Sequence, residues 1–160
     1  MSLKLELSTS LVHIFDRPVM REEAIGALAS LLQTHGYVRE TFAQAVLERE
    51  KVFPTGLPTQ PIGIAIPHTD AEHVKRAALA VGILPQPVQF EEMGSPGTFV
   101  DVSVIVVLAI PDPKAVMPVL RQLAGSFQNR EFLQGLQAAR DQSTVLDLVA
   151  GTIPDAVARV

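Results

Sequence analysis

The sequence contains no cysteine and no tryptophan, and it has a single tyrosine. Without cysteine, disulfide bonds, thiol catalysis and thiolate metal sites are excluded. The shortage of aromatic side chains leaves little material for stacking on bases or sugar rings. No cluster of lysine and arginine appears, and the formal net charge is −4 at pH 7, which disfavours nucleic acid as a partner. A mildly acidic surface weakly favours a basic protein partner.

Long hydrophobic runs are also missing. The longest apolar stretches, such as Val102 to Pro111 with its interrupting Ser103, are far shorter than a membrane span. Lys4 and Glu6 interrupt the apolar residues at the N-terminus, so we expect no signal peptide and a cytoplasmic location. With 160 residues, 48% of them apolar and 19% charged, the chain has the profile of one compact domain.

Several enzyme classes lack their sequence signatures here. The chain contains no G-x-x-x-x-G-K-[ST] phosphate loop, no G-x-G-x-x-G, no G-x-S-x-G nucleophile elbow and no H-E-x-x-H motif. ATP hydrolysis, dinucleotide redox chemistry and serine esterase chemistry therefore have no support. The spacing of His68 and His73 does not bring two side chains to one helix face, so we expect no metal site.

Helical and apolar segments alternate along the chain. The apolar spacing predicts a helix over Arg21–His35, ended by Gly36, and a second helix over Arg39–Lys51. Near-continuous apolar runs at Ala78–Leu84 and Val102–Ile110 predict buried strands. The remaining predictions are strands at Leu11–Phe15 and Ile62–Pro67, a loop at Phe90–Gly97, and helices near Pro113–Phe127, Arg130–Arg140 and Ser143–Val149. This alternation predicts an α/β fold with helices on both faces of the sheet.

The junction at Pro67 and His68 is the most informative segment, because an apolar run ends there and a polar one begins. Thr69 and Glu72 match the T-x-x-E capping box, which predicts a helix start after His68. Amides at a helix start carry partial positive charge and hold phosphate well. A histidine at this position could therefore carry a phosphoryl group. The alternative interpretation is a histidine that merely ends a strand.

Arg49 lies on the apolar stripe of the second predicted helix, close to its end. A guanidinium in that position needs an anionic partner, because burying an unpaired charge is costly. One interpretation is an ordinary ion pair with an aspartate or glutamate, or a side chain that reaches water. The other is that its partner is a phosphoryl group on His68, held by the bidentate fork of the guanidinium.

The segment Gly63-Ile-Ala-Ile-Pro-His68 resembles the active-site segment of enzyme IIA of the sugar phosphotransferase system, in the fructose–mannitol superfamily. The resemblance extends over most of the chain, through Arg49-Glu50, Pro54 to Leu57, Pro67 to Val74, Phe90 to Pro96, Val100 to Ile110 and Leu123 to Phe127. It is greatest for the galactitol-type branch. The resemblance implies the mannitol-type IIA fold, a single-layer mixed, mostly parallel sheet flanked by helices on both faces, in one IIA domain over residues 1–160.

The resemblance also implies a phosphohistidine relay. Phospho-HPr would donate a phosphoryl group to His68, a IIB component would accept it, and the membrane IIC component would couple the transfer to galactitol-like sugar uptake. His68 would be the nucleophile and Arg49 the phosphate-stabilising arginine, and no nucleotide, metal or other cofactor is needed. Single-domain length argues against fusion to IIB or IIC. The alternatives are a regulatory IIA-like module that senses phosphorylation state and binds protein targets, and a structural α/β interaction domain.

One departure from the mannitol-type pattern affects the list of site residues. Those members carry a second active-site histidine early in the helix after the long strand, but Ile110 to Met117 contains none, and Val116 occupies that place by rough alignment. The role of this second histidine is then absent, or it is supplied by His73 or by the Thr55 hydroxyl. We therefore expect Thr55, Thr69 and His73 as supporting residues at the phosphate site.

Overall fold

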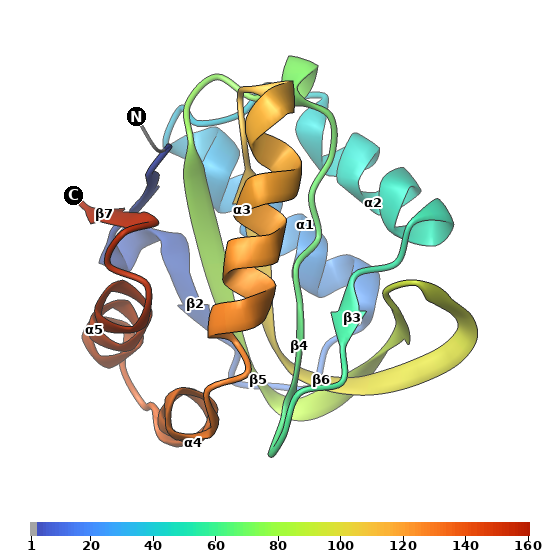
Figure 1. The fold of residues 1–160 in the computed structure, drawn as a ribbon, viewed down its shortest axis with the longest axis vertical. Coiled ribbons are helices and arrows are strands. Elements are labelled where there is room, and N and C mark those ends of the chain that lie inside the picture. The colour runs from blue at the N-terminus through green and yellow to red at the C-terminus, as the bar shows by residue number, and fades with distance from the viewer. Residues whose placement is uncertain (1–2) are drawn as a thin grey trace.

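The computed structural model describes residues 3–160 and contains one sheet of seven strands with helices packed on both of its faces (Figure 1). The strands are β1 (Leu5–Leu7), β2 (Val12–Ile14), β3 (Gly56–Leu57), β4 (Gly63–Ala65), β5 (Ala78–Glu92), β6 (Ser95–Ala109) and β7 (Val157–Arg159). The helices are α1 (Arg21–Thr34), α2 (Phe42–Val52), α3 (Pro113–Ser126), α4 (Arg130–Ala138) and α5 (Gln142–Thr152), with 3₁₀ turns η1 (Thr9–Leu11) and η2 (Ala71–His73).

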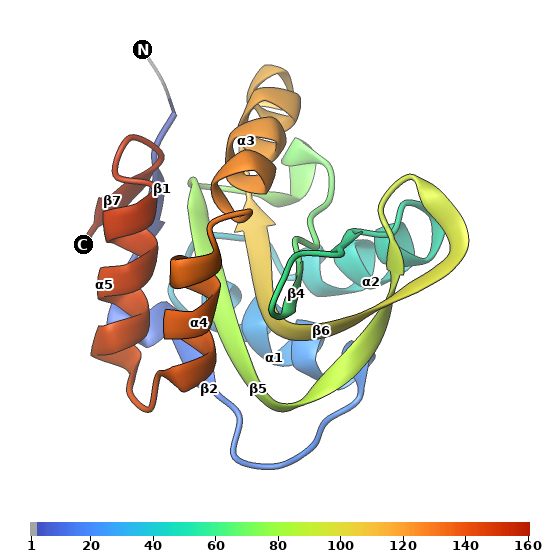
Figure 2. The same cartoon turned by 60° about the horizontal axis from the view of Figure 1, so that its bottom comes forward.

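The sheet is mixed and mostly parallel, as predicted. Its strand order is β3-β4-β6-β5-β1-β7, and β2 also pairs with β5. The β3–β4 and β5–β6 pairs are antiparallel, whereas β1–β5, β1–β7, β2–β5, β3–β5 and β4–β6 are parallel. Helices α1 and α2 lie on one side of the sheet, and α3, α4 and α5 on the other (Figures 1 and 2). This arrangement confirms the predicted α/β class.

The centre of the sheet forms because its two longest strands are apolar on both faces. The first seven residues of β5 and the last six of β6 are all buried, and they pair from Ala78 opposite Ala109 to Ile83 opposite Val104. Side chains buried on both faces contribute about 25 cal/mol for each Å² of apolar surface removed from water. The predicted strands Ala78–Leu84 and Val102–Ile110 are therefore confirmed at their apolar cores.

The prediction of a loop at Phe90–Gly97 was wrong. Strands β5 and β6 continue through most of this segment as a long hairpin, which turns at Met93 and Gly94, where the φ of Gly94 is +77°. Phe90 opposite Val100 is the last buried pair of this hairpin. Backbone pairing carries the hairpin beyond it, with Glu91 opposite Phe99, and needs no apolar alternation on the side chains there. Figure 2 shows this hairpin projecting beside α2.

Other boundaries moved for local reasons. Helix α1 ends at Thr34, and Gly36 has a φ of +81°, which confirms the predicted glycine after the helix. Helix α2 begins at Phe42 instead of Arg39, because the preceding residues form a turn in which the Phe42 amide donates to the Arg39 carbonyl at 3.0 Å. The predicted strand Leu11–Phe15 is shortened to β2, since its first residue belongs to η1.

Strand β4 leads to His68, and its position depends on a close backbone approach. A Cβ atom on Gly63 would overlap the carbonyl oxygen of Asp101 and would lie 2.7 Å from Cγ1 of Val100. Only glycine allows β4 to lie this close to β6 at the irregular register between Gly63 and Ile64. Within residues 3–160, no helix combines the length and the apolar character needed to cross a membrane.

Candidate active site

His68 lies in a surface pocket of about 450 Å³ where three segments meet: the last turns of α2, the chain after β4, and the start of α3. Figures 1 and 2 both show the first turn of α3 beside the segment that contains η2. The Leu108 amide donates to the Pro67 carbonyl at 2.9 Å and thereby ties the residue before His68 to β6. The pocket is lined by Arg49, His68, Thr69, Asp70, Ala71, Glu72, Pro113, Val116 and Met117.

The imidazole of His68 is half-buried and held by its own backbone. Its Nδ1 atom lies 2.9 Å from the carbonyl oxygen of Ile66. A carbonyl oxygen can only accept, so this hydrogen bond requires the ring hydrogen on Nδ1. The Nε2 atom then carries the lone pair. The geometry therefore leaves Nε2 as the nucleophilic nitrogen of the ring.

The surroundings of His68 favour its neutral form. Burial lowers the pKa of the imidazole below its ordinary value of 6.5, because the charged form loses hydration. The hydrogen bond to Ile66 opposes this shift, the positive charge of Arg49 lowers the pKa further, and Asp70 raises it. The net direction is downward. At neutral pH the ring is uncharged and able to attack an electrophile.

Arg49 reaches the same pocket from α2. Its Nη1 atom lies 3.1 Å from Oδ1 of Asp70, and its guanidinium stacks over the Phe53 ring at 4.5 Å from the ring centre. The ion pair and the location beside His68, which were alternative interpretations of the sequence, thus occur together. The Nε atom of Arg49 is buried and has no hydrogen-bond partner among residues 3–160. A cation with an unsatisfied buried donor is suited to an anionic ligand.

The structure brings only one of the three expected supporting residues to the pocket. Thr69 is buried and lines it beside His68. The Thr55 hydroxyl is instead buried elsewhere and donates to Oε1 of Glu50 at 2.8 Å. The His73 ring turns away, with Nδ1 at 2.8 Å from Oγ1 of Thr41. Among the residues described, neither Thr55 nor His73 lines the His68 pocket.

The predicted capping box at Thr69 and Glu72 was wrong. Only a short 3₁₀ turn, η2, follows His68, and its N-cap is Asp70, with no side-chain capping bond. The chain cannot continue as an α-helix because Val74 pairs with Val38 in a β-bridge, and the Arg39 amide donates to the His73 carbonyl at 2.9 Å. The segment after His68 therefore supplies no aligned α-helix amides to this site.

Sequence reasoning did not assign Asp70, Phe53 or Met117 to the site. For Asp70, the position two residues after His68 was the available signal. Phe53 and Met117 are apolar and strongly exposed, at 58% and 55%, and no periodic pattern identifies such residues. Val116 lines the pocket, in agreement with its rough alignment to the second histidine of mannitol-type proteins.

Sequence comparisons with known proteins show the family to which this chain is related. Residues 7–151 match the model of the family described as phosphoenolpyruvate-dependent sugar phosphotransferase system, EIIA 2. The chain is 30% identical over 118 residues to the galactitol-specific EIIA component of Escherichia coli K12, which covers 74% of this chain and 78% of that protein. The predicted resemblance to the galactitol-type branch is thereby confirmed.

Solved structures show the same fold. A chain in the complex of enzyme IIAMtl and phosphorylated enzyme IIBMtl from Escherichia coli superposes with a TM-score of 0.75 at 24% identity, over 92% of this chain and 99% of that one. The crystal structure of IIA mannitol from Escherichia coli gives a TM-score of 0.73 at 24% identity, over 90% and 99% of the two chains. The mannitol-type IIA fold is confirmed. The chain belongs to the EIIA 2 family of the phosphoenolpyruvate-dependent sugar phosphotransferase system, and it is a phosphotransferase.

Proposed function

We propose that Nε2 of His68 accepts a phosphoryl group from phospho-HPr and passes it to a IIB component, with the membrane IIC component coupling this transfer to sugar uptake. The observation that carries the proposal is the hydrogen bond from Nδ1 of His68 to the Ile66 carbonyl, at 2.9 Å, in a pocket shared with Arg49. It leaves one nitrogen free, unprotonated and next to a cation. The exchange between these carriers takes place in the cytoplasm.

The chemistry needs no group beyond the two imidazoles and the phosphoryl group. The Nε2 lone pair of His68 attacks phosphorus, and a new N–P bond forms as the P–N bond to the donor imidazole breaks. The hydrogen on Nδ1 stays on His68 and remains hydrogen-bonded to the Ile66 carbonyl oxygen. A phosphorylated ring that keeps this hydrogen is cationic, and it therefore leaves readily when the IIB acceptor attacks in turn.

The neighbours of His68 divide the remaining tasks. A phosphoryl group brings a charge of about −1.5 to −2, which the guanidinium of Arg49 offsets with its free Nε hydrogen and its fork of donors. Thr69 lines the pocket next to the ring. Pro113, Val116 and Met117 form an apolar wall on α3, which limits the access of water to the N–P bond.

The relative that is 30% identical to this chain is galactitol-specific, and we propose a galactitol-like sugar on that basis. To test this assignment, the phosphorylated protein is mixed with a purified IIB component of the galactitol type or of the mannitol type. The rate of phosphoryl transfer to each IIB component is then compared. Faster transfer to the galactitol-type IIB supports it. Equal or faster transfer to the mannitol-type IIB contradicts the sugar assignment and leaves the carrier function intact.

The carrier function itself is tested by incubation with phosphoenolpyruvate, enzyme I and HPr, followed by mapping of the acid-labile phosphohistidine. We expect label on His68 only, and no label on the folded His68→Ala variant. His73→Ala is the matched control, because its ring contacts Thr41 outside the pocket, and it should be labelled normally. Label that persists in His68→Ala, on any other histidine, contradicts the assignment.

A further inference from the structure

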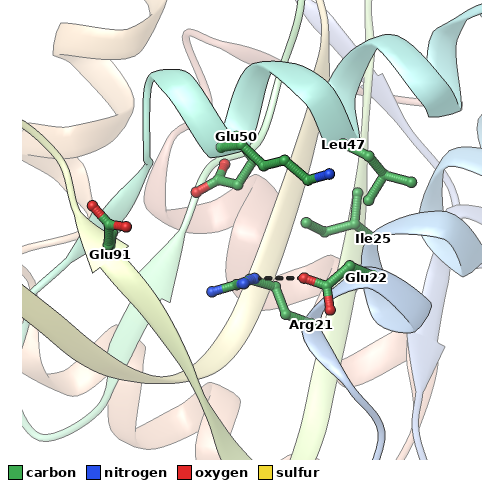
Figure 3. Close-up of a pocket in the computed structure, with 7 residues that line it drawn as sticks. Arg21, Glu22, Ile25, Leu47, Glu50 and Glu91 are labelled. Carbon is green, nitrogen blue, oxygen red and sulfur yellow. Dashed lines mark hydrogen bonds and ion pairs between the residues drawn. The ribbon is translucent and has the colours of Figure 1, made fainter. Parts of the chain in front are cut away.

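Glu50, the residue after Arg49, is a buried carboxylate without a cationic partner. Only 8% of its surface is exposed, and it borders a small pocket of about 130 Å³ between α1, α2 and β5. Figure 3 shows that the guanidinium lining this pocket, that of Arg21, is joined to Glu22 and not to Glu50. In residues 3–160 no lysine or arginine forms an ion pair with it. A carboxylate buried in this way needs another set of donors.

Both oxygens of Glu50 find their donors on one residue. The Thr55 amide donates to Oε2 at 2.8 Å, and the Thr55 hydroxyl donates to Oε1 at 2.8 Å. Two short bonds between the same two residues fix both the distance and the orientation of the groups. They close the connection between the end of α2 and the start of β3, and we call this pair the Glu50–Thr55 clasp.

Backbone bonds continue from the clasp to the imidazole. Strand β3 pairs with β4, with Gly56 opposite Ala65, and the Ile66 amide donates to the Thr55 carbonyl at 3.4 Å. The carbonyl of the same Ile66 accepts from Nδ1 of His68 at 2.9 Å. One residue, Ile66, therefore lies between the clasp and the His68 ring, with its amide bound to Thr55 and its carbonyl bound to His68. On its other side, Glu50 is covalently next to Arg49.

We propose that Glu50 is a positioning residue for phosphoryl transfer, which acts through Thr55 to hold the α2 end that carries Arg49 in register with the β4 end that carries His68. This inference rests on the proposed function of His68. Phosphoryl transfer is sensitive to such registration, because a misplacement of about 1 Å can cost roughly 10²-fold in rate. Glu50 touches neither the ring nor the guanidinium fork, so its effect must pass through the backbone.

The clasp does not depend on the charge of Glu50. A protonated carboxyl or a glutamine can accept from the Thr55 amide through one atom and donate to the Thr55 hydroxyl oxygen through the other. The charged groups that face Glu50 are Arg21 and Glu22 from α1, Lys51 from α2 and Glu91 from β5, and they line its pocket without bonding to it. Glu50→Gln therefore keeps the clasp, whereas Glu50→Ala removes it.

The test compares Glu50→Ala and Glu50→Gln with Glu48→Ala, a matched change on the exposed face of the same helix. For Glu50→Ala we expect kcat for phosphorylation by phospho-HPr to fall about tenfold to a hundredfold with KM unchanged. Nitrogen NMR of His68 in the folded protein should also show loss of the single Nδ1–H tautomer. Glu50→Gln and Glu48→Ala should keep both the wild-type kcat and the tautomer.

A folded Glu50→Ala protein with wild-type kcat and an unchanged His68 tautomer overturns the proposal. If Glu50→Ala does not fold, Thr55→Val takes its place, with Thr55→Ser as the conservative rescue. Thr55→Val should lower kcat and Thr55→Ser should restore it, and a wild-type rate and tautomer in Thr55→Val overturn the proposal equally. A wild-type protein that is not phosphorylated refutes the carrier function instead, and the tautomer measurement still decides whether Glu50 positions His68.

Discussion

The Nη1 atom of Arg49 lies 3.1 Å from Oδ1 of Asp70, so the cation of the His68 pocket is already paired with a carboxylate from the segment that follows the histidine. The two side chains are 37% and 63% exposed, and a pair this open contributes only about 0–1 kcal/mol. A phosphoryl group on His68 can therefore share or take the guanidinium at little cost, while the carboxylate of Asp70 remains nearby.

Asp70→Asn should shift the phosphoryl equilibrium toward phosphorylated His68. The carboxylate competes for Arg49 and repels the phosphoryl group, so its removal should raise the equilibrium constant by about twofold to fivefold, which corresponds to an exposed pair of up to about 1 kcal/mol. The measurement is the phosphorylated fraction at equilibrium with a known ratio of phospho-HPr to HPr. Asp147→Asn, which breaks an exposed ion pair with Arg159, is the control and should change nothing. A lower phosphorylated fraction in Asp70→Asn contradicts this account.

Arg49→Gln should slow phosphoryl transfer in both directions by about 10²-fold, the cost of losing one well-placed donor to developing charge. Arg49→Lys should recover only part of the rate, because an ammonium lacks the bidentate fork. Rapid-quench measurements of phosphorylation by phospho-HPr and of transfer to IIB give both directions. Arg17→Gln, which breaks an exposed pair with Glu23, serves as control. Wild-type kinetics in Arg49→Gln means that the arginine only pairs with Asp70.

The sequence predicted those parts of the fold in which the pattern of apolar residues or a glycine indicates the local structure. Ala78–Leu84 is apolar on every residue and forms the buried core of β5, and Gly36 ends α1 in the conformation that glycine favours. Strands β1, β3 and β7 have only two or three residues each, too few for any periodicity to appear. Strands β1 and β7 pair with each other from opposite ends of the chain, and β3 pairs with β4 and β5, so strand pairing and not periodicity defines them.

The candidate site shows the same division. His68 and Arg49 stand out by residue type, since each is a polar group on an apolar element, and the structure places both in one pocket. Thr55 and His73 were expected at the site as replacements for the missing second histidine. The Thr55 hydroxyl is instead bonded to Glu50, and Nδ1 of His73 is bonded to Thr41. Whether a side chain makes such a competing hydrogen bond depends on which side of the backbone faces the pocket. A single sequence does not reveal that orientation.

Transfer to His68 should remain active to lower pH than an ordinary histidine allows. Burial lowers the pKa of the imidazole below 6.5, so the nucleophilic neutral form persists through pH 6.5 and is lost only below the lowered value. The folded state then binds fewer protons than the unfolded state, so this group's contribution to stability is lost as pH falls below 6.5. Titration of the His68 ring by NMR measures its pKa. The transfer rate measured over the same pH range shows whether activity follows the neutral form of the ring. A ring pKa at or above 6.5 contradicts the prediction.

Glu50 should give stability a pH dependence of the opposite sign. Burial raises the pKa of its carboxyl from 4.5 to about 7, so between these values the folded state holds a proton that the unfolded state has released. The stability of the wild type should therefore fall, relative to Glu50→Gln, as pH rises from 4.5 to about 7, by up to about 3 kcal/mol, and the difference should stay constant above that range. Urea unfolding of both proteins at pH 5 and pH 8 measures it. Parallel stability curves contradict the assignment.

Val116→His should stabilise the phosphorylated state by restoring an imidazole to the pocket wall. Val116 lies on the first turn of α3, lines the His68 pocket and is only partly buried, so a polar ring there can keep one nitrogen in water. A ring N–H that donates to a phosphoryl oxygen contributes about 1 kcal/mol, which corresponds to roughly a fivefold shift in equilibrium toward phospho-His68. The phosphorylated fraction in the presence of HPr measures this shift, and Val116→Leu is the control for side-chain size. If Val116→His and Val116→Leu give the same fraction, the imidazole makes no bond to the phosphoryl group, and an apolar wall at this position serves the site as well as a second histidine.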